Sequence, residues 1–114
     1  MKKIAALMIF MSSIVFGMHA QNSKASFPGG EEALQEYITT HLQYPAEAKA
    51  NGIEGVVGVL FVVKTDGTIG NIKIKRMIDP DLEAEAIRLV KEMPKWIPAA
   101  TDSEQSVDIN FEID

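Results

Sequence analysis

The segment from Gly55 to Arg76 constrains the fold more than any other part of this sequence. Two runs rich in β-branched and aromatic residues lie on either side of an Asp66-Gly67 pair. This arrangement is the strongest short-range signal for a β-hairpin, because Gly67 can adopt the positive φ that such a turn needs. The first run is apolar on both faces, which is typical of a central strand. The second run alternates isoleucine with lysine. One face of the hairpin is therefore expected to be apolar and buried, and the other to carry both apolar and charged side chains.

The two faces of the first run lead to different expectations. One face carries Val57, Val59, Phe61 and Val63, and the other carries Val56, Leu60 and Val62. The second face has two interpretations, which the sequence leaves open. It is either the ordinary result of strand propensity on a partly exposed surface, or an apolar patch through which two copies associate as a homodimer.

The first twenty residues form a segment of a different kind. Lys2 and Lys3 precede an apolar run from Ile4 to Met18, and Ala20 offers a small residue for cleavage. This pattern predicts a secretory signal peptide over residues 1–20, since the run is short for a membrane span of ~20 residues. A polar leader would cover residues 21–26 and the folded domain residues 27–114. The folded part would lie outside the cytoplasm, with membrane contact only if the signal segment stays uncleaved.

Charge and residue types exclude several classes of function. Two of the eleven Lys and Arg residues lie in the predicted signal peptide, so nine remain against sixteen acidic residues, a net charge of about −7. No basic footprint for nucleic acid is present. The chain has no cysteine, and His41 is the one histidine after the signal peptide, so neither a metal site nor a nucleophile–base pair can be assembled. We therefore predict a protein that is not an enzyme and has no cofactor.

Three segments have the periodicity and the end signals of helices. Glu31 to Leu42 carries apolar residues at helical spacing behind two N-terminal glutamates. Ala46 to Asn51 follows a proline and precedes Gly52, a suitable C-terminal cap. The third helix begins at Asp79-Pro80 and ends before Pro94. Its buried stripe is predicted to be Leu82, Ala86, Leu89, Val90 and Met93.

The end of the chain completes the predicted sheet. Trp96 is expected to be a core aromatic, and Ala99 to Gln105 a polar loop. From Val107 to Asp114 apolar residues alternate with polar ones, which predicts a strand with one buried face. A right-handed crossover through the third helix would lay this strand beside the first. The expected fold is α+β, a three-stranded antiparallel-type sheet in the order 2-1-3 with helices on one face. The last strand would then be an open edge.

Several short motifs occur in a consistent order along residues 27–114. They are Phe27-Pro28-Gly29-Gly30-Glu31-Glu32-Ala33-Leu34, Tyr44-Pro45-Ala46-Glu47-Ala48, Gly52-Ile53-Glu54-Gly55, the Asp66-Gly67 hairpin, Glu85-Ala86 and Met93-Pro94-Lys95-Trp96-Ile97-Pro98. With these motifs the chain resembles the TonB C-terminal domain family, in the stand-alone form that is common in Bacteroidetes. The resemblance covers nearly all of the predicted mature chain.

The resemblance implies a periplasmic protein-binding module in TonB-dependent transmembrane transport. In this family the domain captures a short extended segment of an outer-membrane receptor as an added strand on the edge of its last strand. Here that edge would be Ser106, Val107, Asp108, Ile109, Asn110, Phe111, Glu112 and Ile113. The segment around the Tyr-Pro pair also contacts the receptor in the family, and here it is His41, Leu42, Gln43 and Tyr44.

One departure from the family concerns the role of energy transducer. A full TonB has an uncleaved anchor and a long proline-rich spacer, whereas only residues 21–26 separate signal and domain here. The alternative function is a stand-alone periplasmic adaptor or homodimer that is not linked to transport. For the last strand, the alternative to β-augmentation is an ordinary edge whose acidic face keeps neighbouring strands away. The sequence names neither the receptor nor a motor complex.

Overall fold

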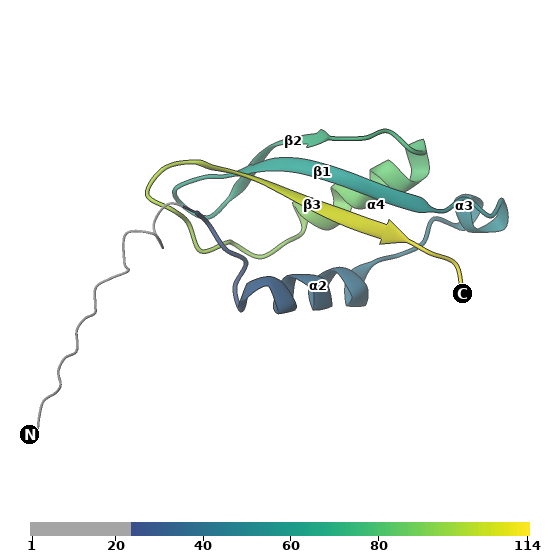
Figure 1. Cartoon of the computed structure of the whole chain (residues 1–114), viewed down its shortest axis with the longest axis horizontal. Helices are drawn as coiled ribbons and strands as arrows, with labels where there is room; N and C mark the ends of the chain where they lie inside the picture. Colours follow the sequence, from purple (N-terminus) through teal and green to yellow (C-terminus); the bar gives the residue numbers. More distant parts are fainter. Residues whose placement is uncertain (1–23) are drawn as a thin grey trace, which may run out of the picture.

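A computed structural model describes residues 24–114 of the chain (Figure 1). The predicted signal peptide and the first part of the leader lie outside these described residues. The elements are the helices α2 (Gly30–His41), α3 (Ala46–Ala50) and α4 (Pro80–Lys91), and the strands β1 (Gly55–Val63), β2 (Ile69–Ile74) and β3 (Ser103–Phe111). The strands form one sheet in the order β2-β1-β3, and β1 pairs antiparallel with both neighbours. The predicted α+β fold and strand order are confirmed.

The hairpin between β1 and β2 turns at the predicted Asp66-Gly67 pair. Lys64 N–H donates to the Thr68 carbonyl at 2.8 Å, so three residues form the loop between them. Gly67 has φ of 87°, the left-handed conformation that closes a three-residue hairpin loop. The Asp66 carboxylate accepts bonds from the N–H and the hydroxyl of Thr68 at 3.0 and 2.6 Å. These side-chain bonds are local to the turn, so they stabilise it independently of packing against the core.

An irregularity in β2, which the periodicity did not predict, places all three isoleucines of this strand on the buried face of the hairpin. The pairing shifts between Leu60 and Val62 on β1, and Asn71 on β2 has a positive φ of 51°. A bulge of this kind adds one residue to one strand, so the side chains beyond it change faces. Ile69, Ile72 and Ile74 consequently all pack against the core, although an unbroken alternation would separate the first from the other two.

The core lies between the sheet and the helical layer. The inner faces of β1 and β3 and the stripe of α4 contribute its largest fully buried side chains, which include Val57, Val59, Phe61, Leu82, Leu89, Ile109 and Phe111. α4 begins where the Asp79 carboxylate accepts bonds from the N–H groups of Asp81 and Leu82 at 3.0 and 3.1 Å, as predicted for an N-cap. Asp79, Pro80 and the acidic first turn therefore place α4 where its stripe faces the sheet.

The short helix α3 ends in a Schellman motif. The Gly52 N–H donates to the Lys49 carbonyl at 3.1 Å, and the Ile53 N–H donates to the Ala48 carbonyl at 2.9 Å. Gly52 has φ of 68°, so it is the left-handed residue that this motif requires. The turn directs Ile53 against the core and leads the chain into β1.

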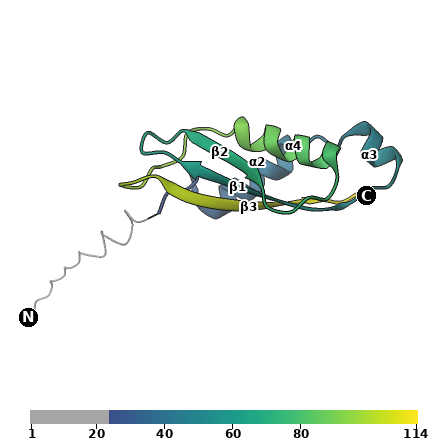
Figure 2. The ribbon, with the colours of Figure 1, turned by 90° about the horizontal axis from the view of Figure 1, so that it is seen from above.

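The helices α2 and α4 lie in one layer, on the same side of the sheet (Figures 1 and 2). α4 covers one face of the sheet, and α2 runs along the β3 side in the same layer (Figures 1 and 2). The Tyr37 hydroxyl on α2 donates to the Leu89 carbonyl on α4 at 2.7 Å, which joins the two helices. Leu34 and Ile38 are the buried residues of α2. α2 thus lies next to the outer edge of the sheet.

The last strand differs from its prediction at both ends. It begins at Ser103, so the prediction of a polar loop over Ala99 to Gln105 is wrong for its last three residues. It ends at Phe111, so Glu112 and Ile113 lie beyond it. The register explains the difference, because all nine residues of β1 have a partner in β3, from Val63 with Ser103 to Gly55 with Phe111. The polar side chains at the even-numbered positions of β3 point toward the outer face of the sheet, which no helix of the described residues covers, so they remain in contact with water.

Candidate functional site

The outer edge of β3 is the first component of the candidate site. Among residues 24–114, β3 pairs with β1 and with no other strand. The Lys75 N–H donates to the Gly58 carbonyl at 2.7 Å, so the backbone groups of Gly58 point toward β2. Backbone groups alternate in direction along a strand, so those of Val57 and Val59 point toward β3. Their partners Ile109 and Val107 are therefore the hydrogen-bonded ones.

This alternation identifies the backbone groups at the free edge. The odd-numbered residues of β3 bond to β1, and their side chains point into the core. The even-numbered residues turn their N–H and C=O groups away from β1 and their side chains toward solvent. No backbone hydrogen bond joins these even-numbered residues to any other described segment. They are Glu104, Ser106, Asp108 and Asn110.

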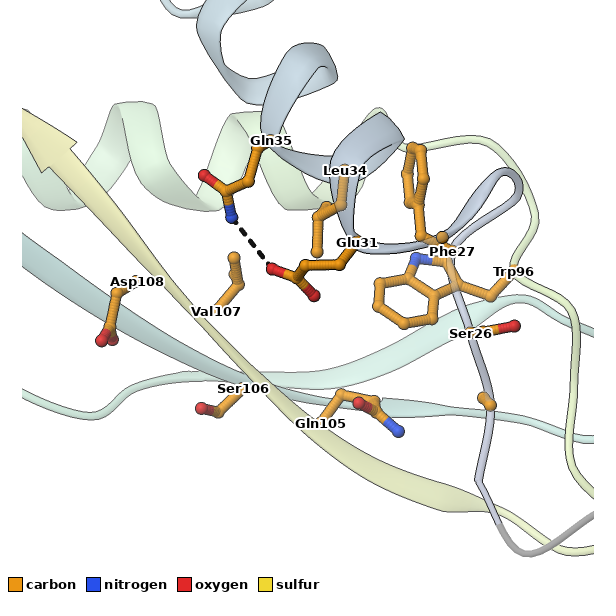
Figure 3. A pocket seen from close by; sticks show the side chains of 12 residues that line it. Ser26, Phe27, Glu31, Leu34, Gln35, Trp96, Gln105, Ser106, Val107 and Asp108 are labelled. Atoms are coloured by element: carbon orange, nitrogen blue, oxygen red, sulfur yellow. Dashed lines mark hydrogen bonds between the residues drawn. The ribbon is translucent and has the colours of Figure 1, made fainter. Parts of the chain in front are cut away.

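A groove lies along this edge, between β3 and the N-terminal half of α2. Its volume is about 380 Å³. Apolar side chains of Phe27, Leu34, Trp96 and Val107 line it, and Figure 3 shows that they come from four separate segments. Glu31 and Gln35 line it from the helix, where the Gln35 amide donates to the Glu31 carboxylate at 3.2 Å. Of β3, residues Gln105 to Asp108 line the groove, so a further strand at ~4.8 Å from β3 would pass along it there.

The aromatic end of the groove is built around Trp96, which is only 6% exposed. Its ring packs edge-on against Phe27 and Phe61, with centroids 5.7 and 5.4 Å apart. Its backbone N–H donates to the Gly67 carbonyl at 2.9 Å, so the hairpin tip holds the Trp96 backbone. Its indole Nε1 has no hydrogen-bond partner among the described residues. Trp96 is a core aromatic, as predicted, and it also forms part of the groove.

The segment His41 to Tyr44 lies at the opposite end of α2 and is fixed to α4. Glu85, which is 8% exposed, accepts a bond from the Gln43 N–H at 2.7 Å. Arg88 donates to the same carboxylate through Nε and Nη2, both at 2.7 Å, and its Nη2 also donates to the His41 carbonyl at 2.9 Å. Glu85 raises the pKa of the Arg88 guanidinium, chiefly through this hydrogen bond. The charged pair thus holds the segment from two sides.

The side chains of His41, Leu42 and Tyr44 make different contacts. The His41 ring stacks on Tyr37 with a centroid distance of 4.5 Å. Leu42 packs at the border of the core. Tyr44 donates its hydroxyl to the Ile53 carbonyl and packs edge-on against Phe111, 5.6 Å between centroids. Since Phe111 ends β3, the structure brings the segment to the C-terminal end of the predicted edge.

The outer face of the sheet holds the residues predicted for self-association. Val56 is 40% exposed, and Leu60 and Val62 are half-buried. No helix covers this face (Figure 2). The register places Leu60 between Lys73 on β2 and Ser106 on β3. The face is therefore apolar along its centre and polar on both flanks.

Within residues 24–114, no three His, Asp or Glu side chains gather as metal ligands do. In that range no helix is long and apolar enough to cross a membrane. Glu85, the buried carboxylate, is occupied by Arg88 and the Gln43 N–H. The candidate site is a row of outward-facing backbone groups beside a groove that both apolar and polar side chains line.

The sequence reasoning identified the strand edge but not the helical wall of the groove. The sequence places Leu34 in a helix, but nothing in residues 30–41 indicates which neighbour that helix lies beside. It places Phe27 in the family motif and not in a groove. The Phe27-Pro28-Gly29-Gly30 segment is the signal that could have located the wall, because it sets where the helix begins. Phe27 is buried against Trp96 directly before that start.

Fold and groove together define a small α+β module whose sheet ends, among the described residues, in a strand with one free edge. Residues 40–114 match the family model for the C-terminal region of the Gram-negative bacterial TonB protein, and the chain belongs to this family. The family is not known as one of enzymes, and its domains are periplasmic in Gram-negative bacteria. The match begins at Thr40, so the α2 wall of the groove lies almost entirely outside it.

Solved structures show the same fold. One NMR structure of the Helicobacter pylori TonB C-terminal domain is 24% identical with a TM-score of 0.58, covering 71% of this chain and 90% of that one. A longer fragment of the same domain is 20% identical with a TM-score of 0.59, covering 90% of this chain and 98% of that one. A search of curated proteins found no match.

Proposed function

We propose that this chain is a periplasmic protein-binding module of TonB-dependent transport that binds an extended peptide segment by adding it to β3 as a fourth strand. The single observation that supports this proposal is the row of outward-facing backbone groups on Glu104, Ser106, Asp108 and Asn110, of which Ser106 and Asp108 line a groove. Backbone hydrogen bonds would supply affinity, and the groove would receive alternate side chains of the guest. Family membership favours an outer-membrane receptor as the source of the segment.

The guest strand has a defined length and orientation of side chains. The outward-facing residues span Glu104 to Asn110, which is about 20 Å at ~3.3 Å per residue. A segment of six or seven residues would cover them. Its alternate side chains would point inward, onto Leu34, Phe27, Trp96 and Val107, so apolar residues suit those positions. The others would lie on the outer face of the sheet.

The segment His41 to Tyr44 would be a second contact for the same partner. It lies beside the C-terminal end of β3, because Tyr44 packs against Phe111. Its backbone is held by Glu85 and Arg88, so it offers a surface that is already ordered. A receptor whose peptide leaves the groove at this end would meet the exposed Gln43 and His41 side chains.

Amide exchange of the β3 residues tests the proposal directly. In the free protein, the N–H groups of Ser106, Asp108 and Asn110 should exchange fast, and those of Val107 and Ile109 slowly. A peptide that adds as a strand should slow the even-numbered amides and leave the odd-numbered ones unchanged. Uniform protection in the free protein, or unchanged exchange with millimolar receptor peptide, would contradict the proposal. The emission of Trp96, the one tryptophan in the chain, provides an independent titration signal.

Two matched variants separate the edge from the fold. Ser106→Pro removes an outward N–H and places a ring where the guest would lie, and proline is tolerated on the free side of an edge strand. The variant should fold and lose binding. Val107→Pro is the control, because it removes a bond to β1 and should disrupt the sheet itself. Full binding by a folded Ser106→Pro protein would exclude the β3 edge as the site.

A second candidate function is self-association through the outer face of the sheet. The exposed Val56 and the half-buried Leu60 and Val62, which no helix covers, favour it. In this arrangement the chain would be a stand-alone periplasmic adaptor or homodimer that is not linked to transport. Leu60→Lys should leave the monomer folded and disperse the dimer. Sedimentation that finds a monomer in the unaltered protein at high concentration would exclude this function.

A further inference from the structure

The aromatic end of the groove is built by the short segment that precedes α2. The Ser26 N–H donates to the Ile97 carbonyl at 3.0 Å, and the Ile97 N–H donates to the Ser26 carbonyl at 2.8 Å, which makes an isolated antiparallel bridge. Phe27 follows Ser26 and Trp96 precedes Ile97, so this Ser26–Ile97 bridge holds the two rings edge to face, with centroids 5.7 Å apart. Ser26, Phe27 and Trp96 all line the groove. The bridge therefore belongs to the architecture of the candidate site.

A second contact ties the same segment to the start of β3. The Ala25 N–H donates to the Ser103 hydroxyl at 3.5 Å, and the Gln105 side-chain amide donates to the same hydroxyl at 2.9 Å. Because Ala25 and Gln105 both line the groove, the segment meets β3 at the aromatic end. Residues 25 and 26 are held by these few hydrogen bonds, whereas β3 is paired with β1 along its whole length. The segment should therefore open locally more often than the sheet does.

The two ends of the groove differ in chemistry. The rings of Phe27 and Trp96 form one end, and both are nearly buried in the lining. Along α2 the lining includes Glu31 and Gln35, which a hydrogen bond of 3.2 Å joins. Figure 3 shows Trp96 and Gln35 at opposite ends, with Glu31 between them. An inward-pointing guest side chain would thus meet apolar rings at one end and polar groups farther along.

We infer that the Ser26–Ile97 bridge determines the specificity of the groove, because it positions the aromatic end to select one large apolar side chain of the guest. This inference rests on the proposed function, since it names the guest position that is selected and the residues that select it. Ser26 and Ile97 act through Phe27 and Trp96, so they are positioning residues. Guest binding and closure of the bridge are then coupled. The coupling is reciprocal, so a guest that prefers the closed bridge also keeps the bridge closed.

Capped heptapeptides with valine at the inward positions and serine at the outward positions provide the test on the full mature chain. Each terminal inward position in turn carries leucine or alanine, because the direction of the guest strand decides which of the two meets Trp96. Trp96 emission would measure affinity, and exchange of the β3 amides would locate the peptide. At one terminal position leucine should bind about 10-fold tighter than alanine, because three more carbon atoms leave water. At the other, where the lining is mixed, the preference should be about 2-fold.

Matched variants assign the preference to the bridge. Ser26→Pro removes the N–H that donates to the Ile97 carbonyl, and the larger leucine preference should fall to about 2-fold. Ser26→Ala is the control, since it keeps both backbone bonds and should keep the preference. Ser103→Ala removes the hydroxyl that Ala25 bonds and should reduce the preference by less than Ser26→Pro. Urea unfolding checks that each variant retains the folded sheet.

Amide exchange in the unaltered protein tests the same coupling without a variant. The Ser26 and Ile97 N–H groups donate the two bonds of the bridge, so their exchange reports its opening. At saturation, the leucine peptide should slow both amides about 5-fold more than the alanine peptide does, which is the factor by which Ser26→Pro lowers the preference. A purely structural role of the bridge would give the same exchange with either peptide.

The outcomes separate this inference from the function on which it rests. Binding without a leucine preference, or an equal preference in folded Ser26→Pro and Ser26→Ala, would overturn the inference and leave strand addition intact. If Ser26→Pro does not fold, equal exchange of the Ser26 and Ile97 amides with the two peptides would overturn it. Failure of every peptide to bind, with unchanged exchange at Ser106 and Asp108, would overturn the proposed function and the inference together.

Discussion

The contact between the hairpin tip and Trp96 yields a quantitative prediction about Gly67. An ideal Cβ at Gly67 would lie 2.5 Å from the Trp96 carbonyl oxygen, where real Cβ atoms do not occur. Gly67 also has a positive φ. Gly67→Ala should therefore impose backbone strain and push the Trp96 segment away, with loss of the Trp96 N–H to Gly67 carbonyl bond of 2.9 Å.

The magnitude follows from these parts. The left-handed conformation costs an alanine ~1–2 kcal/mol, and alanine recovers roughly 0.4–1 kcal/mol through the unfolded state. The lost hydrogen bond adds about 0.5–1.5 kcal/mol. The free energy of unfolding should therefore fall by about 2 kcal/mol, out of roughly 5–15 kcal/mol for a small domain. The melting temperature should fall by about 8–16 °C.

Gly52→Ala is the matched control for this prediction. Gly52 has a similar positive φ, and an added Cβ meets nothing within 4 Å. It should lose only about 1 kcal/mol, the net of strain and unfolded-state entropy. Urea unfolding followed by circular dichroism measures both variants, and Trp96 emission should change in the native state of Gly67→Ala alone. If the two variants lose the same stability and show the same emission, the hairpin tip does not hold Trp96.

Three further predictions concern the helices. Asp79→Ala should lower the free energy of unfolding by about 1 kcal/mol, because the first N–H groups of α4 lose their cap; urea unfolding measures this. Glu85→Ala should cost about 2 kcal/mol, since Arg88 and the α2–α3 connection lose a charged hydrogen-bond partner, and a cost equal to that of an exposed pair would contradict the assigned role. Burial raises the pKa of the Tyr37 hydroxyl, and Glu92 adds to the effect. As the pH rises above about 10, the unfolded chain therefore loses this proton first and stability falls. Burial raises the pKa of Tyr44 as well, so Tyr37→Phe should reduce this fall without removing it, which thermal unfolding from pH 9 to 11 would show.

The sequence predicts those parts of the fold that local patterns determine. The Asp66-Gly67 turn, the Asp79 cap and the Gly52 cap are each local, because a few neighbouring residues supply both the conformation and the hydrogen bonds. The strand order also follows, since an apolar strand must be central and a crossover has one preferred hand.

Other features depend on contacts between distant segments. The bulge at Asn71 allows three isoleucines of β2 to pack against one core, and the identity of Asn71 alone does not predict it. The start of β3 at Ser103 is set by the length of β1, forty residues earlier. The groove depends on where α2 lies relative to β3, which bonds such as Tyr37 to Leu89 determine. Periodicity describes which face of a helix is buried and not which neighbour buries it.

The pairing of Ser26 with Ile97 has a mechanical consequence. Two backbone bonds of 3.0 and 2.8 Å join these residues directly beside Phe27 and Trp96. Tension applied to the chain before Ala25 would therefore load both this bridge and the bond that the Ala25 N–H donates to the Ser103 hydroxyl of β3 at 3.5 Å. A guest strand on β3 that is pulled along its own axis would share the load among all its hydrogen bonds, whereas a sideways pull would break them one after another. Force on the preceding chain would thus reach the aromatic end of the groove through Ser26 and the start of β3 through Ala25.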